Sequence, residues 1–356
     1  MPARFSQVAS GVEHRLKHQP LLRRARVLDV SAELARIELL EGPLAGETVT
    51  GLYYRDLGAA PVEGEEVAAN TVGLEMGLGT GGVALIVPPL DGSTAAPANE
   101  NHFVKLPYTP LQFPASSPPQ AEDLSGVPVV VLSLHSHLAP ACCAAATLKP
   151  ACRTTFVWQE GGALPVALSR TVRELKGRGL LHAVVSSGSA FGGDLEAPNV
   201  YSGFLAAASA QSGARLVLAG VGPGLLGTAT AFGHGGMAAA IALNAASSLG
   251  AEPVLAPRLS SADPRARHRG LSHHTRAALG SAIAGCRVAL PASCDVSLEG
   301  LPGRHTYEFV EAGAAGSQER FGVTFESMGR CYEDDPVFFD AAAAAAALAL
   351  DGGSSG

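Results

Sequence analysis

Short apolar runs that alternate with polar residues fill the first part of the chain. Between residues 25 and 87 these runs are separated by turn-forming residues such as Glu41-Gly42-Pro43. Alternation of this kind is typical of strands with one buried face. It predicts strands at Arg26–Val30, Ala35–Leu40, Thr48–Tyr54, Glu66–Thr71 and Val83–Val87. We therefore expect a small N-terminal β-barrel or β-sandwich-like domain.

The pattern changes after residue 126. Short, fully apolar runs now alternate with longer helical stretches, beginning with Val129–Leu134 and Ala139–Leu148. Further strands are predicted at Thr154–Trp158, Ala183–Val185, Arg215–Ala219, Pro253–Ala256 and Arg287–Leu290, and helices at Leu164–Arg178, Asn199–Gln211, Met237–Leu249 and His273–Ala284. Regular strand–helix alternation predicts an α/β fold with a mostly parallel, doubly wound sheet.

These patterns divide the chain into four segments. We expect a small β-rich domain over residues 1–88, a linking segment over 89–126, an α/β domain over 127–350 and a flexible tail over 351–356. The alanine-rich run Ala341–Leu350 is too apolar to face water. It is expected to be buried in the monomer or at a subunit contact, and a homodimer is compatible with the second case.

The composition restricts the partners of the 356-residue chain. Its net charge of -7 argues against nucleic acid and anionic membranes, because neither attracts an acidic protein. No apolar run is long enough to span a membrane. The charged residues Glu13, His14 and Arg15 leave no apolar core for a signal peptide. We therefore expect a cytoplasmic protein, whose six cysteines are core residues and not a disulfide framework.

Loops that follow the predicted strands carry most of the reactive side chains. Ligands of open α/β sheets bind at the carboxyl ends of the strands. The loops after Val129–Leu134, Ala183–Val185, Arg215–Ala219 and Pro253–Ala256 are therefore expected to meet at one rim of the sheet. The candidate catalytic residues on these loops are His268, His273, His274, Asp194, Glu196 and Asp263.

The segment Arg258–Thr275 holds four arginines and three histidines but only one carboxylate, Asp263. Burying unpaired charges of one sign costs several kcal/mol per ion, so the segment needs an anionic partner. Within it Arg265, Arg267 and Arg269 recur at every second position. Guanidinium groups bind phosphate and carboxylate in bidentate fashion, so these three are candidate ligands of a small anionic molecule. Neutralisation by carboxylates of the protein is the alternative.

A glycine-rich loop follows the predicted strand Arg215–Ala219. Gly222, Gly224 and Gly227 match G-x-G-x-x-G, and with Thr228 they are expected to hold an anion on free backbone amides. The match to a dinucleotide site is weak, because the next helix begins well downstream and no acidic residue ends the following strand. The alternative is that the glycines allow close packing of helix on sheet.

The histidines suggest a divalent metal, the one cofactor that the residues indicate. His135 and His137 form an H-x-H pair after a strand, and His234 is a further candidate ligand. Ser272 is a good N-cap for a helix whose first turn would contain His273 and His274. The helix dipole disfavours a charged imidazole there, so we expect both to be mainly neutral at pH 7 and able to accept a proton or bind a metal.

Several strings together resemble an uncharacterised bacterial protein family of Actinobacteria and Firmicutes. They are MGLGTGG at Met76–Gly82, FGGDLEA at Phe191–Ala197, GPGLLGTAT at Gly222–Thr230 and RHRGLSHHT at Arg267–Thr275, joined by Val104–Gln112 and Ser327–Arg330. The likeness spans residues 27–341. It implies a bacterial cytoplasmic protein, but it implies no activity.

Three functions of different classes fit these residues. The first is an enzyme for a small anionic, phosphorylated substrate, with His273 or His274 as general acid or base and Asp194 or Glu196 orienting it. The second is a metal-dependent hydrolase that uses His135, His137 and Asp194. The third is a regulatory protein that binds a metabolite at the same rim without converting it.

Overall fold

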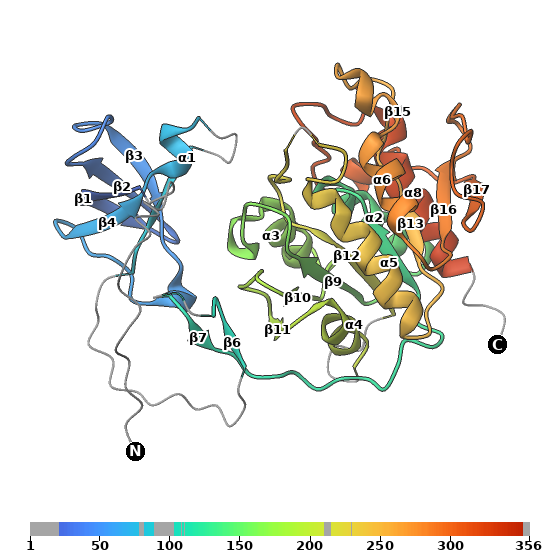
Figure 1. Cartoon of the computed structure of the whole chain (residues 1–356), viewed down its shortest axis with the longest axis horizontal. Coiled ribbons are helices and arrows are strands. Elements are labelled where there is room, and N and C mark those ends of the chain that lie inside the picture. The colour runs from blue at the N-terminus through green and yellow to red at the C-terminus, as the bar shows by residue number, and fades with distance from the viewer. Residues whose placement is uncertain are drawn as a thin grey trace, which may run out of the picture. The chain divides into compact units, whose positions relative to one another are not determined.

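The computed structural model describes residues 21–77, 82–88, 103–107, 109, 111–209, 215–228 and 230–351. The chain forms two compact units, which divide between Thr94 and Ala95 (Figure 1). The predicted tail after Asp351, the start of the chain and most of the first half of the linking segment lie outside the described residues. So does the centre of the string Met76–Gly82.

The first unit is a closed barrel, which confirms the predicted small N-terminal β-domain. Its strands are β1 (Leu22–Ser31), β2 (Leu34–Leu39), β3 (Thr48–Leu52), β4 (Glu66–Asn70) and β5 (Val83–Ile86), in the order β1-β2-β3-β5-β4. Side chains alternate between the two faces: Ala25 and Val27 are buried, whereas Arg24 and Arg26 are exposed. Pairing of β1 with β4 closes the barrel and leaves no free edge.

The second unit contains a sheet of eight strands, all parallel, which confirms the predicted α/β fold with a mostly parallel sheet. The strands are β8 (Val129–Leu132), β9 (Thr154–Gln159), β10 (Ala183–Ser187), β11 (Leu195–Ala197), β12 (Leu216–Val221), β13 (Val254–Ala256), β16 (Arg287–Pro291) and β17 (Thr306–Val310). Their order is β11-β10-β9-β12-β8-β13-β16-β17. The chain leaves β8 toward β9 but leaves β12 toward β13, in the opposite direction. This reversal is the type of position where open α/β sheets bind ligands.

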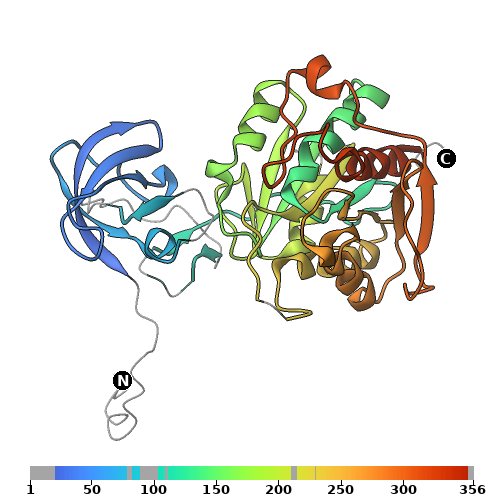
Figure 2. The same ribbon diagram turned by 90° about the horizontal axis from the view of Figure 1, so that it is seen from above.

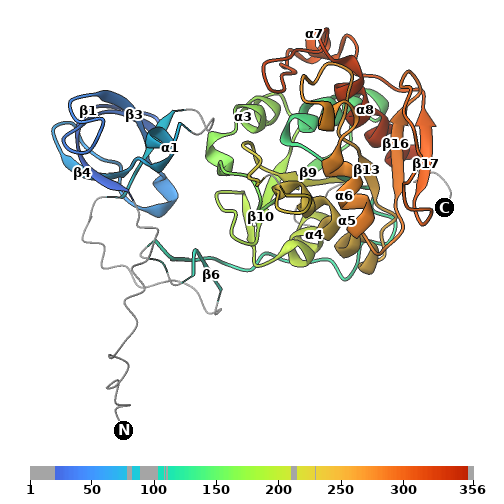
Figure 3. The same ribbon diagram turned by 45° about the horizontal axis from the view of Figure 1, so that its top comes forward.

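Helices cover both faces of this sheet, as its fully buried strands require. On one face lie α2 (Leu138–Leu148), α3 (Arg170–Gly177) and α8 (Pro336–Asp351). On the other lie α4 (Val200–Ala208), α5 (Ala238–Ser248) and α6 (His273–Ser281) (Figures 2 and 3). Strand β8 has apolar side chains on both faces of the sheet. Val130 and Leu132 pack against the first helix layer, whereas Val129 and Val131 pack against the second.

The alanine-rich run Ala341–Leu350 forms most of α8 and is buried within the monomer. Helix α8 packs against α2 and the sheet, and alanine side chains permit this close approach. Its burial inside one chain removes the reason for placing it at a subunit contact. None of the helices in the described ranges has the length and apolar character needed to cross a membrane.

Candidate functional site

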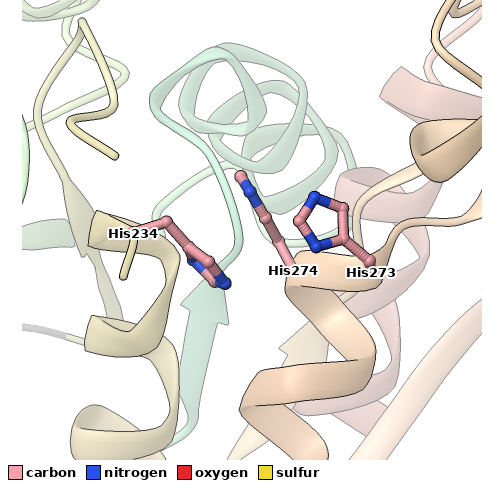
Figure 4. A group of neighbouring side chains, drawn as sticks. All are labelled: His234, His273 and His274. Atoms are coloured by element: carbon pink, nitrogen blue, oxygen red, sulfur yellow. The ribbon is translucent and has the colours of Figure 1, made fainter. Parts of the chain in front are cut away.

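Three histidines meet where α5 and α6 begin. His234 directly precedes a short 3-10 turn (Gly235–Met237) that leads into α5, and His273 and His274 are the first residues of α6 (Figure 4). The centroid of the His274 ring lies 3.8 Å from that of His234 and 4.3 Å from that of His273. His274 is thus the middle member, and we call these three residues the histidine cluster.

Each ring of the cluster has one nitrogen that is buried without a hydrogen-bond partner. His234 Nε2 lies 3.0 Å from the carbonyl oxygen of Ala231, so it carries the proton and donates it. Its Nδ1 is then a lone-pair acceptor, and it is buried without a hydrogen-bond partner. His273 Nε2 and His274 Nδ1 are also buried and unpartnered. Most buried polar atoms in proteins are satisfied, so three exceptions at one place require an explanation.

The imidazoles of the cluster are neutral near pH 7. Burial, followed by the charges of His234 and His273, lowers the pKa of His274 to about 3. Burial also lowers the pKa of His234 and of His273, and for His273 the charges of His234 and Arg267 act in the same direction. The sequence predicted this direction for the pair on α6. The main cause, however, is burial, followed by the charges of neighbouring histidines and arginines.

His268 packs against both histidines of α6. It is buried, and its ring centroid lies 4.8 Å from that of His273 and 4.9 Å from that of His274. Arg267 Nε donates to its Nε2 at 3.4 Å, so its Nδ1 carries the proton and donates to Ser272 Oγ at 2.7 Å. Ser272 Oγ also accepts from the backbone N–H of His274 and so caps α6, as predicted. His268 therefore positions the helix that carries two of the cluster residues.

Asp263 anchors an arginine network next to the cluster. It is fully buried, and its carboxylate accepts from Arg265 Nε and Nη2 at 3.0 and 2.9 Å and from Arg258 Nη2 at 3.0 Å. Burial alone would raise the pKa of Asp263, but the hydrogen bonds from Arg265 and Arg258 hold it well below its usual range. Asp263 thus stays ionised and does not carry protons, which differs from the catalytic role considered for it. Arg265, expected to bind an external anion, is held by this carboxylate instead.

Other arginines remain open to a ligand. A pocket of about 450 Å³ lies beside the cluster and is lined by Ala266, Arg267, Arg269, Gly270, Leu271, His273, Arg276, Asp295, Val296 and Ser297. Among the described residues, no carboxylate forms an ion pair with Arg267, Arg269 or Arg276. Arg276 was not singled out from the sequence. Its spacing of three residues from His273 on one helix was the available signal, because such residues share a face.

The glycine-rich loop has a packing role and presents His234. A Cβ at Gly222 would lie 2.3 Å from a ring atom of Trp158, and one at Gly235 would lie 2.0 Å from the carbonyl oxygen of Gly161. The backbone N–H of Thr228 donates to the carbonyl of Gly233, and Gly227 pairs with His234 in an isolated bridge. Gly224 adopts a positive φ of 74°. This geometry favours the close-packing alternative over an anion cradle at Gly222, Gly224, Gly227 and Thr228.

The H-x-H pair lies in a buried 3-10 turn (His135–His137) directly after β8. His135 Nε2 bonds with Ser169 Oγ at 2.8 Å, and the fully buried His137 packs against Phe338. Burial lowers the pKa of His135 to about 4 and that of His137 to about 3. In the part of the chain that the structure describes, one group of side chains has ligand atoms close enough to hold a metal ion. It consists of His234, His273 and His274 and does not include the H-x-H pair.

The acids expected to orient a histidine lie elsewhere. Asp194 pairs with Lys176 and accepts from the backbone N–H of Val184, near the start of β10. Glu196, on β11, pairs with the buried Lys105 at 3.0 Å. Strand β11 is five strands from β13 in the sheet, roughly 24 Å at ordinary strand spacing. The loop after β10 returns to the start of that strand and leads into β11 at the edge of the sheet. The structure therefore does not bring Asp194 and Glu196 to the histidine cluster.

The fold and the site define a class: a doubly wound α/β protein with neutral imidazoles and open guanidiniums at the carboxyl ends of its strands. The chain belongs to the family described as protein of unknown function (DUF3866), whose model matches residues 50–346. This agrees with the resemblance to an uncharacterised family. No curated protein and no solved structure matches the chain.

Proposed function

We propose that the protein is an enzyme that acts on a small anionic substrate bound in the pocket beside the histidine cluster. One observation carries the proposal: Arg267, Arg269 and Arg276 line a pocket of about 450 Å³ together with His273, and Asp295 is the one carboxylate among the lining residues. A cavity of this size accommodates a small metabolite. Its excess of positive charge favours an anion, and a phosphorylated substrate would use the bidentate geometry of guanidinium groups.

The arginines supply binding energy. A hydrogen bond from a guanidinium to an anion contributes about 1.5–3 kcal/mol. Arg276 is already oriented, because its Nη1 and Nη2 donate to the carbonyls of Glu299 and Ser297 at 3.3 and 3.4 Å. Arg269 Nη2 likewise donates to the carbonyl of Asp263 at 3.4 Å. Donors that are held in place before the ligand arrives lose less entropy when it binds.

The histidine cluster supplies the reactive groups. His273 lines the pocket, and His274 and His234 lie directly behind it. A neutral imidazole has two uses here: it accepts a proton from the substrate or from water, or it binds a metal ion. The two uses exclude each other at one nitrogen. The general-acid or general-base role predicted for His273 or His274 and the metal-dependent alternative are therefore competing forms of this proposal.

Thermal-shift measurements test the anion site. The full-length protein is melted with inorganic phosphate, pyrophosphate, sugar phosphates, nucleotides and dicarboxylates, and with neutral sugars as controls. A ligand at about a hundred times its dissociation constant adds about 2.7 kcal/mol, which is a readily measured rise in Tm. We expect at least one of the anions to raise the Tm of the wild-type protein. The variants Arg267→Gln and Arg269→Gln should lose this rise.

The matched control is Arg170→Gln. Arg170 is an exposed arginine of the same unit that pairs with Glu326, so this variant makes the same charge change away from the pocket and should keep the shift. Equal shifts in all variants, or none with any anion, would contradict the proposal. Mass spectrometry of the ligand after incubation then separates two outcomes: conversion supports an enzyme, and binding without conversion supports the regulatory alternative.

A further inference from the structure

We propose that His234, His273 and His274 form a three-histidine site for a divalent transition metal. The proposed function supplies only the substrate on which the metal would act. The metal site itself is inferred from the geometry of the three rings. Each ring offers one nitrogen, and these atoms all lie within 4.8 Å of one another. Residues from two separate loops, after β12 and after β13, thus supply one compact set of donors.

The unused nitrogens identify what kind of ligand is missing. His234 is 7 % exposed, and its Nδ1 carries a lone pair because its Nε2–H is committed to the carbonyl of Ala231. His273 Nε2 and His274 Nδ1 are buried and unpartnered in the same region. A hydrogen-bond donor could satisfy one such nitrogen. A metal ion can take a lone pair from each of the three rings, because neutral imidazole nitrogens are the donors that zinc and similar ions take.

The spacing suits coordination after a small adjustment. With zinc–nitrogen bonds of about 2.0–2.1 Å, tetrahedral ligand atoms lie about 3.3 Å apart. From separations of up to 4.8 Å, each nitrogen would move inward by no more than about 1 Å. Because the ring planes of His234 and His274 are only 18° from parallel, at least one of these rings must also rotate out of the stack to direct its lone pair at the shared ion. Three protein ligands leave the fourth position of a tetrahedral ion open, which is the pattern of catalytic zinc sites.

Outer contacts fix the ring of His234 and the start of the helix that carries His273 and His274. The carbonyl of Ala231 fixes the tautomer of His234, as outer hydrogen bonds commonly do for metal-binding histidines. Ser272 caps α6 through the backbone N–H of His274, and His268 Nδ1 donates to the same serine hydroxyl. The start of α6 is thereby fixed before any ion arrives.

The charges around the cluster indicate that the metal binds together with an anion. Arg258, Arg265 and Arg267 all act on His273, so the potential at the cluster is positive. A dication alone is disfavoured there, but an anion in its fourth position reduces the local charge. His273 belongs to both the cluster and the arginine-lined pocket. An anion held by the arginines would therefore lie next to the open position of the metal. Metal binding should strengthen anion binding, and anion binding should strengthen metal binding.

Metal analysis of the full-length, tag-free protein tests the site. The protein is produced in medium supplied with zinc, cobalt, nickel and manganese, dialysed, and measured by inductively coupled plasma mass spectrometry. We expect about one equivalent of zinc, or of another ion late in the divalent series, per chain. In cobalt-loaded protein, we expect the visible d–d absorption of four-coordinate cobalt, and inorganic phosphate should change this spectrum.

Variants assign the ion to the cluster. His274→Ala and His273→Gln should each weaken zinc binding by at least about 100-fold, since even outer-shell changes cost 10- to 100-fold. His182→Gln is the matched control, because His182 is an exposed histidine that accepts from the backbone N–H of Thr154, and it should retain the metal. Circular dichroism verifies that each variant is folded. A folded wild-type chain that takes up no ion, or a His274→Ala chain that takes up as much as the wild type, overturns the inference.

The two proposals fail separately. Arg269 donates to the carbonyl of Asp263 and not to the cluster or to His268. Arg269→Gln should abolish the thermal shift with phosphate but leave the zinc content near one equivalent at saturating zinc. If the protein binds phosphate but no metal, the three-histidine site is wrong and the anion pocket stands. If it binds metal and no anion tested, the reverse holds.

Discussion

The imidazole ring of His274 is stacked on that of His234, with centroids 3.8 Å apart and planes 18° from parallel. Two charged imidazoles could not lie this close in a buried site, because their repulsion would add to the cost of desolvation. The stack therefore requires at least one neutral ring, in line with the lowered pKa of both residues. It also ties the start of α5 to the start of α6, so the cluster is part of the packing of the sheet's second face.

Removal of the metal should lower stability through this cluster. An ion that binds only the folded arrangement stabilises it by mass action, so a strong chelator should reduce the Tm of the full-length protein. His274→Ala should show no chelator effect, because it cannot hold the ion in the first place. Differential scanning calorimetry with and without the chelator measures both. An equal fall in Tm in both proteins would place the ion elsewhere.

Gly235→Ala should disturb the site by displacing backbone. A Cβ at this position would lie 2.0 Å from the carbonyl oxygen of Gly161 and 2.8 Å from its carbonyl carbon. Overpacking against backbone costs about 1–3 kcal/mol or more, and the shift would move the adjacent His234. We expect a lower free energy of unfolding in urea and a reduced zinc content.

Gly280→Ala is the control for this substitution. Gly280 lies in α6, and a Cβ there meets no atom within 4 Å. Alanine is favoured over glycine in a helix by roughly 0.5–1 kcal/mol, so this variant should be as stable as the wild type or more so. If both variants behaved alike, the close approach of Gly235 to Gly161 would not be the cause.

The elements with strong local patterns were predictable from the sequence. Strand β8 is a run of β-branched and leucine residues buried on both faces, which is the signature of a central parallel strand. The start of α6 was fixed by Ser272, whose side chain caps the helix. Two strands of the sheet were missed. Strand β11 spans only Leu195–Ala197, and β17 (Thr306–Val310) is an edge strand in which no residue is fully buried.

The site was predictable as a set of segments but not as a set of contacts. The sequence pointed to His273, His274 and the neighbouring arginines, but it gave His234 different partners, His135 and His137. Strands β12, β8 and β13 are neighbours, so the sequence could not decide which of the loops that follow them would bring ligand atoms together. That choice depends on close packing at Gly222 and Gly235, which has no local signature.

The arginine network shows the same limit. The sequence indicated that the segment Arg258–Thr275 needs negative charge, and Asp263 lay inside it. A second carboxylate, Asp335, comes from the segment that follows β17. It forms an ion pair with Arg330 at 3.3 Å and accepts a hydrogen bond from the backbone N–H of Ser261 at 2.9 Å. Contacts between residues so far apart in the sequence leave no periodic pattern from which they can be inferred.

Asp263→Asn should destabilise the second unit strongly. The carboxylate of Asp263 is fully buried and pairs with Arg258, which is only 3 % exposed, and with Arg265. Removal of one partner of a buried ion pair leaves an uncompensated charge and costs about 3–5 kcal/mol. Glu326→Gln removes the partner of the exposed Arg170, and there the loss should stay below about 1 kcal/mol. Urea unfolding monitored by circular dichroism compares the two, and similar losses would contradict the buried network.

His137 should make stability depend on pH in the acidic range. Its ring is fully buried, and neither nitrogen has a hydrogen-bond partner. Burial, with a smaller contribution from the charge of Arg258, lowers its pKa from 6.5 to about 3. Between these values the unfolded chain binds a proton that the folded chain does not. Stability therefore falls as the pH drops from about 6.5 toward 3, by up to about 1.4 kcal/mol per pH unit for this group, and does not change on its account above 6.5.

His137→Leu should remove this share of the pH dependence. At pH 7 the variant should be as stable as the wild type or slightly more so, because leucine fits an apolar site beside Phe338 and leaves no polar atom unsatisfied. As the pH falls toward 4, the wild type should lose stability faster than the variant. His135, whose pKa is about 4, contributes in the same direction in both proteins, so some slope will remain. His182→Leu, at an exposed position, should change the slope less. Parallel curves of Tm against pH for wild type and His137→Leu would show that this histidine is not held neutral by burial.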